Sequence, residues 1–183
     1  MGEEKWDRST YAQPAPKLPT MTTSRPTLHL LCGKIAAGKS TLAKQLAAAP
    51  ATLLISEDHW TSHLFKEELK TLDDYRIYSA RLRAAMGPHV VAVLKAGLSV
   101  VLDFPANTVE SRRWMRTIVD DAGSADVLHL LNPPDEVCKA RLRARNEAGQ
   151  HPFRTSDAEF EIFSRYFVLP TPDEGFHIVR QAP

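Results

Sequence analysis

The chain has 183 residues, 43% of them hydrophobic and 25% charged, with a formal net charge of +1 at pH 7. This composition fits one soluble globular domain and gives no overall electrostatic reason to bind nucleic acid or a membrane surface. No apolar run approaches the roughly 20 residues that span a bilayer. Two cysteines, Cys32 and Cys138, are too few for a disulfide framework. We expect both to be small core residues of a cytoplasmic protein.

The first 26 residues differ in composition from the rest of the chain. The segment AQPAPKLPTMTTSRP (12–26) is rich in Pro, Ser and Thr and has almost nothing to bury. We therefore expect residues 1–26 to form a disordered arm and residues 27–183 to form the folded domain.

Five short apolar runs predict β-strands, because most are nearly continuous in Val, Leu and Ile, as strands buried on both faces are. They are TLHLLC (27–32), TLLIS (52–56), LSVVLD (98–103), DVLHLL (126–131) and FHIV (176–179). Helical patterns lie between them, over 39–49, much of 61–96, 108–122, 134–146 and 157–167. This alternation predicts an α/β domain of βαβ units, whose parallel sheet binds ligands at the carboxyl ends of its strands.

A Walker A motif, GKIAAGKST (33–41), follows the first expected strand and precedes a helical pattern. Glycines let backbone N–H groups converge on a phosphate, and the positive end of the helix dipole faces the same anion. Lys39 is expected to reach the β- and γ-phosphates of ATP, and the Ser40 hydroxyl to ligate Mg²⁺. Lys34 lies inside the loop but outside the pattern, and we expect its side chain to be solvated. The residues expected around the nucleotide are Gly33, Lys34, Ile35, Ala36, Ala37, Gly38, Lys39, Ser40 and Thr41.

The second expected strand is followed by the acidic pair Glu57 and Asp58. In an open α/β sheet this pair should project toward the same crevice as the phosphate loop. A kinase needs a carboxylate close to the attacking hydroxyl, and we take Asp58 as the candidate base. The alternative is that SEDHW simply caps the next helix. Glu57 and His59 are expected to be solvated or to lie behind the reacting groups.

The third expected strand ends on Asp103, in the Walker-B-like segment SVVLDFPANT (99–108). Phe104 follows where hydrolysing ATPases usually have Glu, which favours phosphoryl transfer over hydrolysis. Asp103 is expected to bind Mg²⁺ through water or to hold the substrate, and the alternative is an Asp that only ends a strand. Asn107 or Thr108 is expected to cap the next helix.

Arginines cluster on two of the expected helices. Arg112, with Arg113 and Arg116 beside it, is a candidate to face the cleft and contact substrate. Arg141 and Arg145 are four residues apart and share a helix face. An arginine over the phosphates neutralises charge in phosphoryl transfer, so these two are the preferred catalytic pair, with Arg154 third. For each arginine the alternative is a solvated basic face.

Taken together, Walker A, ISEDHW, VVLDFPAN and CKARLRARN resemble the small P-loop kinases, which include polynucleotide-kinase domains, zeta toxins and chloramphenicol phosphotransferase. The resemblance implies a P-loop NTPase fold with a five-stranded parallel sheet of order 2-3-1-4-5, flanked by helices and carrying a helical lid. It implies that Asp58 is the catalytic base and that Arg141 and Arg145 serve the lid and the adenine side. Polynucleotide kinases usually carry Arg three residues after the base, whereas this chain has Thr61.

The function expected from these features is transfer of the γ-phosphate of ATP to a hydroxyl of a small molecule. The residues expected to contact that acceptor are Asp58, Asp103, Arg76 and Arg112. Two alternatives stay open. One is a polynucleotide or RNA-end kinase. Its acceptor would be a nucleic acid, which is possible but less favoured than a small molecule. The other is a nucleotide-binding regulatory module without phosphoryl transfer.

Overall fold

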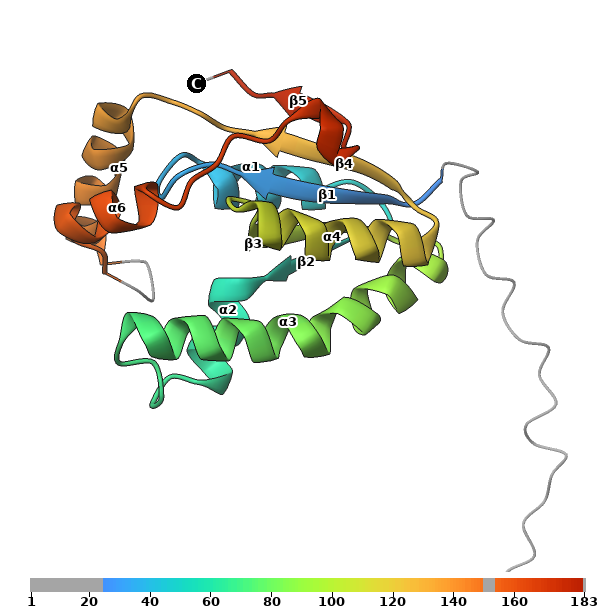
Figure 1. Ribbon diagram of the computed structural model, residues 1–183, viewed down its shortest axis with the longest axis horizontal. Helices are drawn as coiled ribbons and strands as arrows, with labels where there is room; N and C mark the ends of the chain where they lie inside the picture. Colours follow the sequence, from blue (N-terminus) through green and yellow to red (C-terminus); the bar gives the residue numbers. More distant parts are fainter. Residues whose placement is uncertain (1–24, 150–153, 183) are drawn as a thin grey trace, which may run out of the picture.

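The computed structural model describes residues 25–149 and 154–182, so all but the last two residues of the expected arm lie outside the described part. Strands and helices alternate along the chain, in the order expected from the sequence (Figure 1). The elements are β1 (Thr27–Cys32), α1 (Lys39–Ala47), β2 (Thr52–Ser56), α2 (Glu57–Leu64), α3 (Leu72–Lys95), β3 (Ser99–Pro105), α4 (Val109–Ala122), β4 (Ala125–Leu130), α5 (Asp135–Ala148), α6 (Asp157–Ser164) and β5 (Ile178–Arg180). A 3₁₀ turn at Pro172–Glu174 precedes β5.

The described strands form one parallel sheet in the order β2-β3-β1-β4-β5, which confirms the expected topology. The strand β1 lies in the middle of the sheet, so the loop that follows it leaves from the centre of the carboxyl edge. The strands β2 and β5 are the two outer strands. The segments after β2 and after β5 therefore lie at opposite ends of that edge, on either side of the phosphate loop.

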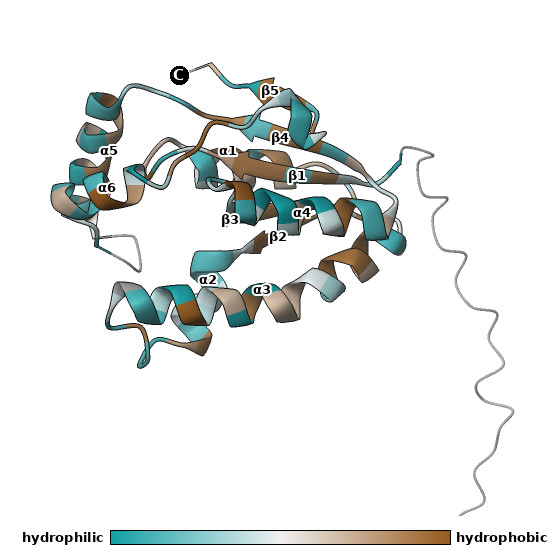
Figure 2. Cartoon of the chain, viewed as in Figure 1, coloured by the Kyte–Doolittle hydropathy of each residue, from teal (hydrophilic) through white to brown (hydrophobic). Residues whose placement is uncertain are grey.

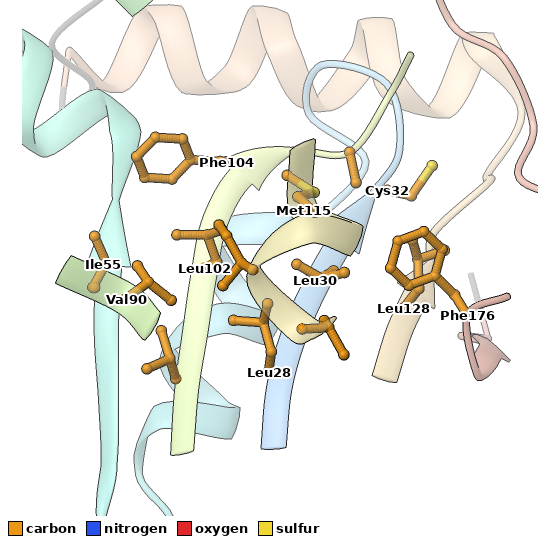
Figure 3. Close-up of a cluster of buried hydrophobic side chains, with 14 of the residues drawn as sticks. Leu28, Leu30, Cys32, Ile55, Val90, Leu102, Phe104, Met115, Leu128 and Phe176 are labelled. Atoms are coloured by element: carbon orange, nitrogen blue, oxygen red, sulfur yellow. The ribbon is translucent and has the colours of Figure 1, made fainter. Parts of the chain in front are cut away.

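Two hydrophobic clusters cover the two faces of the sheet, because successive side chains of a strand point to opposite faces. On one face Cys32 packs in a cluster with Met115 of α4 and with side chains of α3 (Figure 3). On the other face Leu31 packs in a cluster with α1 and with Cys138 of α5. Both cysteines are buried and free, as expected. Burial on both faces makes β1 strongly hydrophobic, whereas α2 and α5 are mainly hydrophilic (Figure 2).

The segment between β2 and β3 differs in detail from the expectation of one helical region beginning at Thr61. The helix α2 begins at Glu57, directly after β2, and Ser56 is its N-cap, whose hydroxyl accepts a hydrogen bond from the His59 N–H at 3.4 Å. A second helix, α3, begins after a capping box formed by Thr71 and Asp74. None of the helices in the described part of the chain has both the length and the apolar composition needed to cross a bilayer.

Candidate active site

The loop between β1 and α1 passes close to the chain after β4, and this approach requires glycine. A Cβ on Gly33 would lie 2.5 Å from the carbonyl oxygen of Leu131, so no side chain fits there. Gly38 caps α1 with a φ of 105°, in the left-handed region that favours glycine. The loop thus turns tightly into the N-terminus of α1, which is the backbone arrangement of an anion-binding loop.

Replacing Gly33 by Ala should lower the free energy of unfolding by roughly 3 kcal/mol, because the added methyl group overlaps a carbonyl oxygen and the loop has to shift. ATP affinity should fall as well, because the backbone N–H groups of the loop move. Gly123→Ala is the matched control: Gly123 also has a positive φ, but no atom lies within 4 Å of its Cβ position. That control should cost about 1 kcal/mol and leave ATP affinity unchanged. Urea unfolding and ATP titration measure both effects, and equal results for the two variants would contradict the argument.

Asn107 clamps the start of the phosphate loop. Its side-chain amide donates to the Gly33 carbonyl oxygen at 2.9 Å and accepts from the Gly33 N–H at 2.9 Å. Asn107 or Thr108 was expected to cap α4, and the N-cap is Thr108, which forms a capping box with Ser111. This clamp was missed in the sequence, where Asn107 carried no signal beyond its place after a strand. It ties the end of β3 to the phosphate loop.

The Lys39 side chain is held inside the loop by the main chain. Its Nζ donates to the carbonyl oxygens of Gly33 and Lys34, at 2.7 and 2.8 Å. Burial lowers the pKa of Lys39, and the negative charges of Asp103 and Asp58 oppose this shift. The ammonium group thus lies between the loop backbone and two carboxylates, which is suitable for contact with phosphate oxygens.

Ser40 and Asp103 come together at the phosphate loop. Asp103 lies near the carboxyl end of β3, and the Ser40 hydroxyl is within hydrogen-bonding reach of its carboxylate. Burial raises the pKa of Asp103, whereas Ser40 and the Lys39 ammonium oppose that rise. Within the described residues, no group of three or more His, Cys, Asp or Glu side chains is arranged to hold a metal ion alone. A hydroxyl and a carboxylate fit Mg²⁺, which takes one or two protein oxygens and fills its other positions with phosphate and water.

Asp58 lies in the first turn of α2, beside the same part of the sheet. Ser56 at the end of β2 pairs with Asp103 of β3 in the parallel register, so Asp58 is only two residues beyond the neighbour of Asp103. Asp58 and Lys39 interact electrostatically, and both line one cleft. Because Ser56 is the N-cap of α2, the capping role weighed for Asp58 in the sequence belongs to Ser56.

Glu57 is fully buried, which favours the second of the two expected alternatives, a place behind the reacting groups, over a solvated side chain. The Tyr75 hydroxyl donates to its Oε2 at 3.0 Å, and Arg83 Nη2 lies 3.5 Å from its Oε1. Burial raises the pKa of Glu57, and Arg83 and Tyr75 oppose the rise. Tyr75 and Arg83 come from α3 and line the cleft, so Glu57 holds two cleft residues in place from behind Asp58.

The arginines of α5 divide into two groups. Arg141 and Arg145 both line the cleft, and Arg141 Nη1 lies 3.5 Å from the Ala37 carbonyl oxygen of the phosphate loop. Burial lowers the pKa of Arg145, and the charge of Asp58 opposes this shift. Arg143 instead forms an ion pair with Asp157 of α6. Arg154, the third candidate for a catalytic arginine, is exposed and lies outside the cleft lining.

Arg112 does not reach the cleft, which corrects its assignment as a substrate residue. Its side chain is fully buried and pairs with Glu174, with Nε at 2.5 Å and Nη2 at 2.9 Å from the carboxylate oxygens. Its Nη1 donates to the carbonyl oxygens of Ala106 and Val168, at 3.0 and 2.9 Å. Arg112 therefore joins the end of β3 to the segment before β5, which is a structural role.

Arg76 and Lys34 are the two remaining basic side chains for which the sequence led to an expectation. Arg76 lies at the rim of the cleft with 81% of its side chain exposed, 3.8 Å from Asp73. The Lys34 side chain was expected to be solvated, but its Nζ pairs with the Asp135 carboxylate at the start of α5, at 2.5 Å. Lys34 therefore joins the phosphate loop to α5, and only its backbone remains a candidate for the nucleotide.

One cleft of about 1500 Å³ brings these elements together. The phosphate loop forms its middle, and Asp58 lies toward the β2 side with Tyr75 and Arg83. The chain after β5, at Gln181 and Ala182, lines the opposite side. The cleft thus has room for a phosphate-bearing ligand in its middle and for a different group at each end.

Comparison with known protein families places residues 28–170 in a family described as an AAA domain. The chain belongs to this AAA domain family. The match covers every element from β1 to α6 and so includes the phosphate loop, Asp58, Asp103 and the arginines of α5. No curated protein sequence matches this AAA domain significantly.

Several solved structures share this P-loop NTPase fold. A candidate kinase from Chloroflexus aurantiacus is 20% identical, with a TM-score of 0.70 over 87% of this chain and 86% of that chain. Kti12 from Chaetomium thermophilum, solved in complex with ADP-AlF3, is 16% identical with a TM-score of 0.61 over 85% and 88% of the two chains. A gluconokinase from Sinorhizobium meliloti is 18% identical with a TM-score of 0.56 over 86% and 84%. At these identities the likeness establishes the fold.

A pair of histidines lies on the sheet of this AAA domain, near the β5 end of the cleft. His29 of β1 and His129 of β4 stack with ring centroids 5.3 Å apart, and His29 Nδ1 lies 3.1 Å from His129 Nε2. Gln181 completes the chain, since its Nε2 lies 2.9 Å from His129 Nδ1. Burial lowers the pKa of His129 to about 4, with a further contribution from His29, and burial also lowers the pKa of His29. Both rings are therefore neutral at pH 7.

This pair predicts a loss of stability in acid. Because the pKa of His129 is about 4 in the folded state and near 6.5 in the unfolded state, the unfolded chain binds the proton first. The contribution is complete above pH 6.5 and declines on the order of 3 kcal/mol as pH falls to about 4. His129→Asn should show a shallower decline than the wild type in urea unfolding across that range. Parallel pH profiles for the two proteins would contradict the assignment.

Proposed function

We propose that this protein is an ATP-dependent kinase that transfers the γ-phosphate to a hydroxyl group of a small molecule. The observation that carries the proposal is the position of Asp58, which shares one cleft with Lys39 and Ser40 of the phosphate loop and lies beside Asp103. A carboxylate at that place can accept a hydroxyl proton. Phe104, which follows Asp103, is buried in the core, so that position supplies no acid to activate a water for hydrolysis.

In the proposed reaction, the acceptor hydroxyl oxygen attacks the γ-phosphorus of ATP and the bond from that phosphorus to the bridging oxygen of ADP breaks. Asp58 takes the hydroxyl proton, and ADP leaves with the electron pair of the broken bond. Lys39, Arg141 and Arg145 offset the charge that spreads over the phosphate oxygens. Ser40 and Asp103 would hold Mg²⁺, which when bound neutralises charge on the β- and γ-phosphates.

The acceptor is proposed to bind on the β2 side of the cleft. Tyr75 and Arg83 line this side, and Glu57 fixes both from behind. Arg76 lies exposed at the rim, where it is free to approach a polar acceptor. The two buried, free cysteines suit a reducing compartment, so we propose that the protein works in the cytoplasm.

The test is transfer of label from γ-labelled ATP, with Mg²⁺, to separate pools of nucleosides, sugars, amino alcohols and RNA oligomers. We expect a labelled small molecule with the wild type and at least about 100-fold less of it with Asp58→Asn. Label found only on RNA ends would replace this proposal by the polynucleotide-kinase alternative. Label found only as free phosphate with every pool would contradict phosphoryl transfer, and ATP binding alone would favour the regulatory module.

A further inference from the structure

The β5 end of the cleft is the part that the proposed reaction leaves without a role. Gln181 and Ala182, in the chain after β5, line it, and Thr41 and Gln45 of α1 line the same cleft. Since β2 and β5 are the outer strands of the sheet, this end is separated from Asp58 by the phosphate loop. If phosphates occupy the loop and the acceptor lies beside Asp58, the nucleoside part of the donor extends toward Gln181.

Gln181 is held there by a defined chain of hydrogen bonds. Its backbone N–H donates to the Leu130 carbonyl oxygen at 2.9 Å, which continues the pairing of β5 with β4. Its side-chain Nε2 lies 2.9 Å from Nδ1 of His129, and Nε2 of His129 lies 3.1 Å from Nδ1 of His29. An amide nitrogen can only donate, so His129 Nδ1 accepts and the His129 proton is on Nε2, from which it is donated to His29.

This polarity determines what the Gln181 side chain offers to a ligand. One of the two N–H groups of its Nε2 is taken by His129, and among the residues that the structure describes none donates to its Oε1. His129 keeps only 6% of its surface exposed and His29 is half-buried on the neighbouring strand, so the stacked rings are held in place. The amide therefore presents a fixed hydrogen-bond acceptor at the end of the cleft.

Resting on the proposed kinase function, we propose that Gln181 is a base-specificity residue whose carbonyl oxygen accepts a hydrogen bond from the amino group of adenine, and that His129 and His29 are the positioning residues that set its orientation. Adenine carries an amino group where guanine carries a carbonyl oxygen. A carbonyl acceptor at this place binds the first and repels the second. The site thereby selects ATP over GTP.

The experiment compares the dissociation constants of ATP, GTP and inorganic tripolyphosphate, each with Mg²⁺, by calorimetry on the full chain at pH 7.5. The wild type should bind ATP at least about tenfold more tightly than GTP, which is the range of one well-placed hydrogen bond. Gln181→Leu should weaken ATP to about the level of GTP and leave tripolyphosphate unchanged, because tripolyphosphate has no base. Arg180→Leu is the matched control, since Arg180 is exposed, adjacent in sequence and outside the cleft lining.

The histidine variants separate positioning from a merely structural role. His129→Asn retains an acceptor oxygen near the place of Nδ1 and should keep most of the preference for ATP, whereas His129→Leu should lose it with tripolyphosphate binding intact. If His129→Leu does not fold, Gln181→Leu at the cleft surface decides alone. Tighter binding of GTP than ATP, or an unchanged ratio in Gln181→Leu, would overturn the inference while leaving the kinase proposal standing. If the wild type bound none of the three ligands, both this inference and the kinase proposal would be contradicted.

Discussion

Asp58→Asn should reduce phosphoryl transfer by about 10²–10⁴-fold, the range that a positioned general base contributes. Asparagine keeps the shape of the side chain but cannot take the proton of the acceptor hydroxyl. ATP affinity should stay equal or rise slightly, because the change removes a negative charge that interacts with Lys39 and Arg145 in the same cleft. Label transfer from γ-labelled ATP measures the rate, and calorimetry measures the affinity.

The matched control for this variant is Asp73→Asn. Asp73 is also in the first turn of a helix near the cleft, but its side chain is 85% exposed and it lies outside the cleft lining. This control should transfer phosphate at the wild-type rate. Retention of more than a tenth of the activity in Asp58→Asn would show that a different group, or the solvent, takes the proton.

The sheet and the phosphate loop were predictable because each leaves a continuous local signal. Strands buried on both faces are apolar at nearly every position, and the expected strands differ from the observed ones by only a few end residues. The loop follows from the Walker A motif between a strand and a helical pattern, and the close approach of Gly33 to Leu131 gives the physical reason for its first glycine. The start of α3 also carried a readable signal, the Thr71–Asp74 capping box.

The roles of charged and amide side chains were harder to predict, because their partners lie far away along the chain. Arg112 is buried because Glu174, 62 residues later, neutralises it. Asn107 contacts Gly33, which precedes it by 74 residues. A local pattern shows that a helix carries arginines or that a strand ends in polar residues, but whether such a side chain faces solvent depends on the tertiary partner. The assignment of Asp58 to the cleft followed instead from its place just after a strand of a parallel sheet. That of Arg141 and Arg145 followed from their shared helix face and from the resemblance to small P-loop kinases.

Lys39→Met should separate binding and catalysis from folding. Its Nζ bonds to two loop carbonyl oxygens, so the variant loses those bonds but also loses the cost of holding an ammonium group in a partly buried place. These terms oppose each other, and the free energy of unfolding without nucleotide should stay within about 1 kcal/mol of the wild type. Phosphoryl transfer should fall by about 10²–10³-fold, because one preorganised donor to the transferred phosphate is missing.

The response of stability to ATP distinguishes this variant from Asp58→Asn. A ligand present at about 100 times its dissociation constant stabilises the folded state by about 2.7 kcal/mol. The wild type and Asp58→Asn should show that increase in thermal melts with ATP and Mg²⁺, whereas Lys39→Met should show little of it at the same ATP concentration. Lys44→Met, an exposed lysine on the same helix, should behave as the wild type. If Lys39→Met retained the full ATP-dependent increase, the ammonium would contribute to the reaction without contributing to binding, and the loop backbone alone would hold the phosphates.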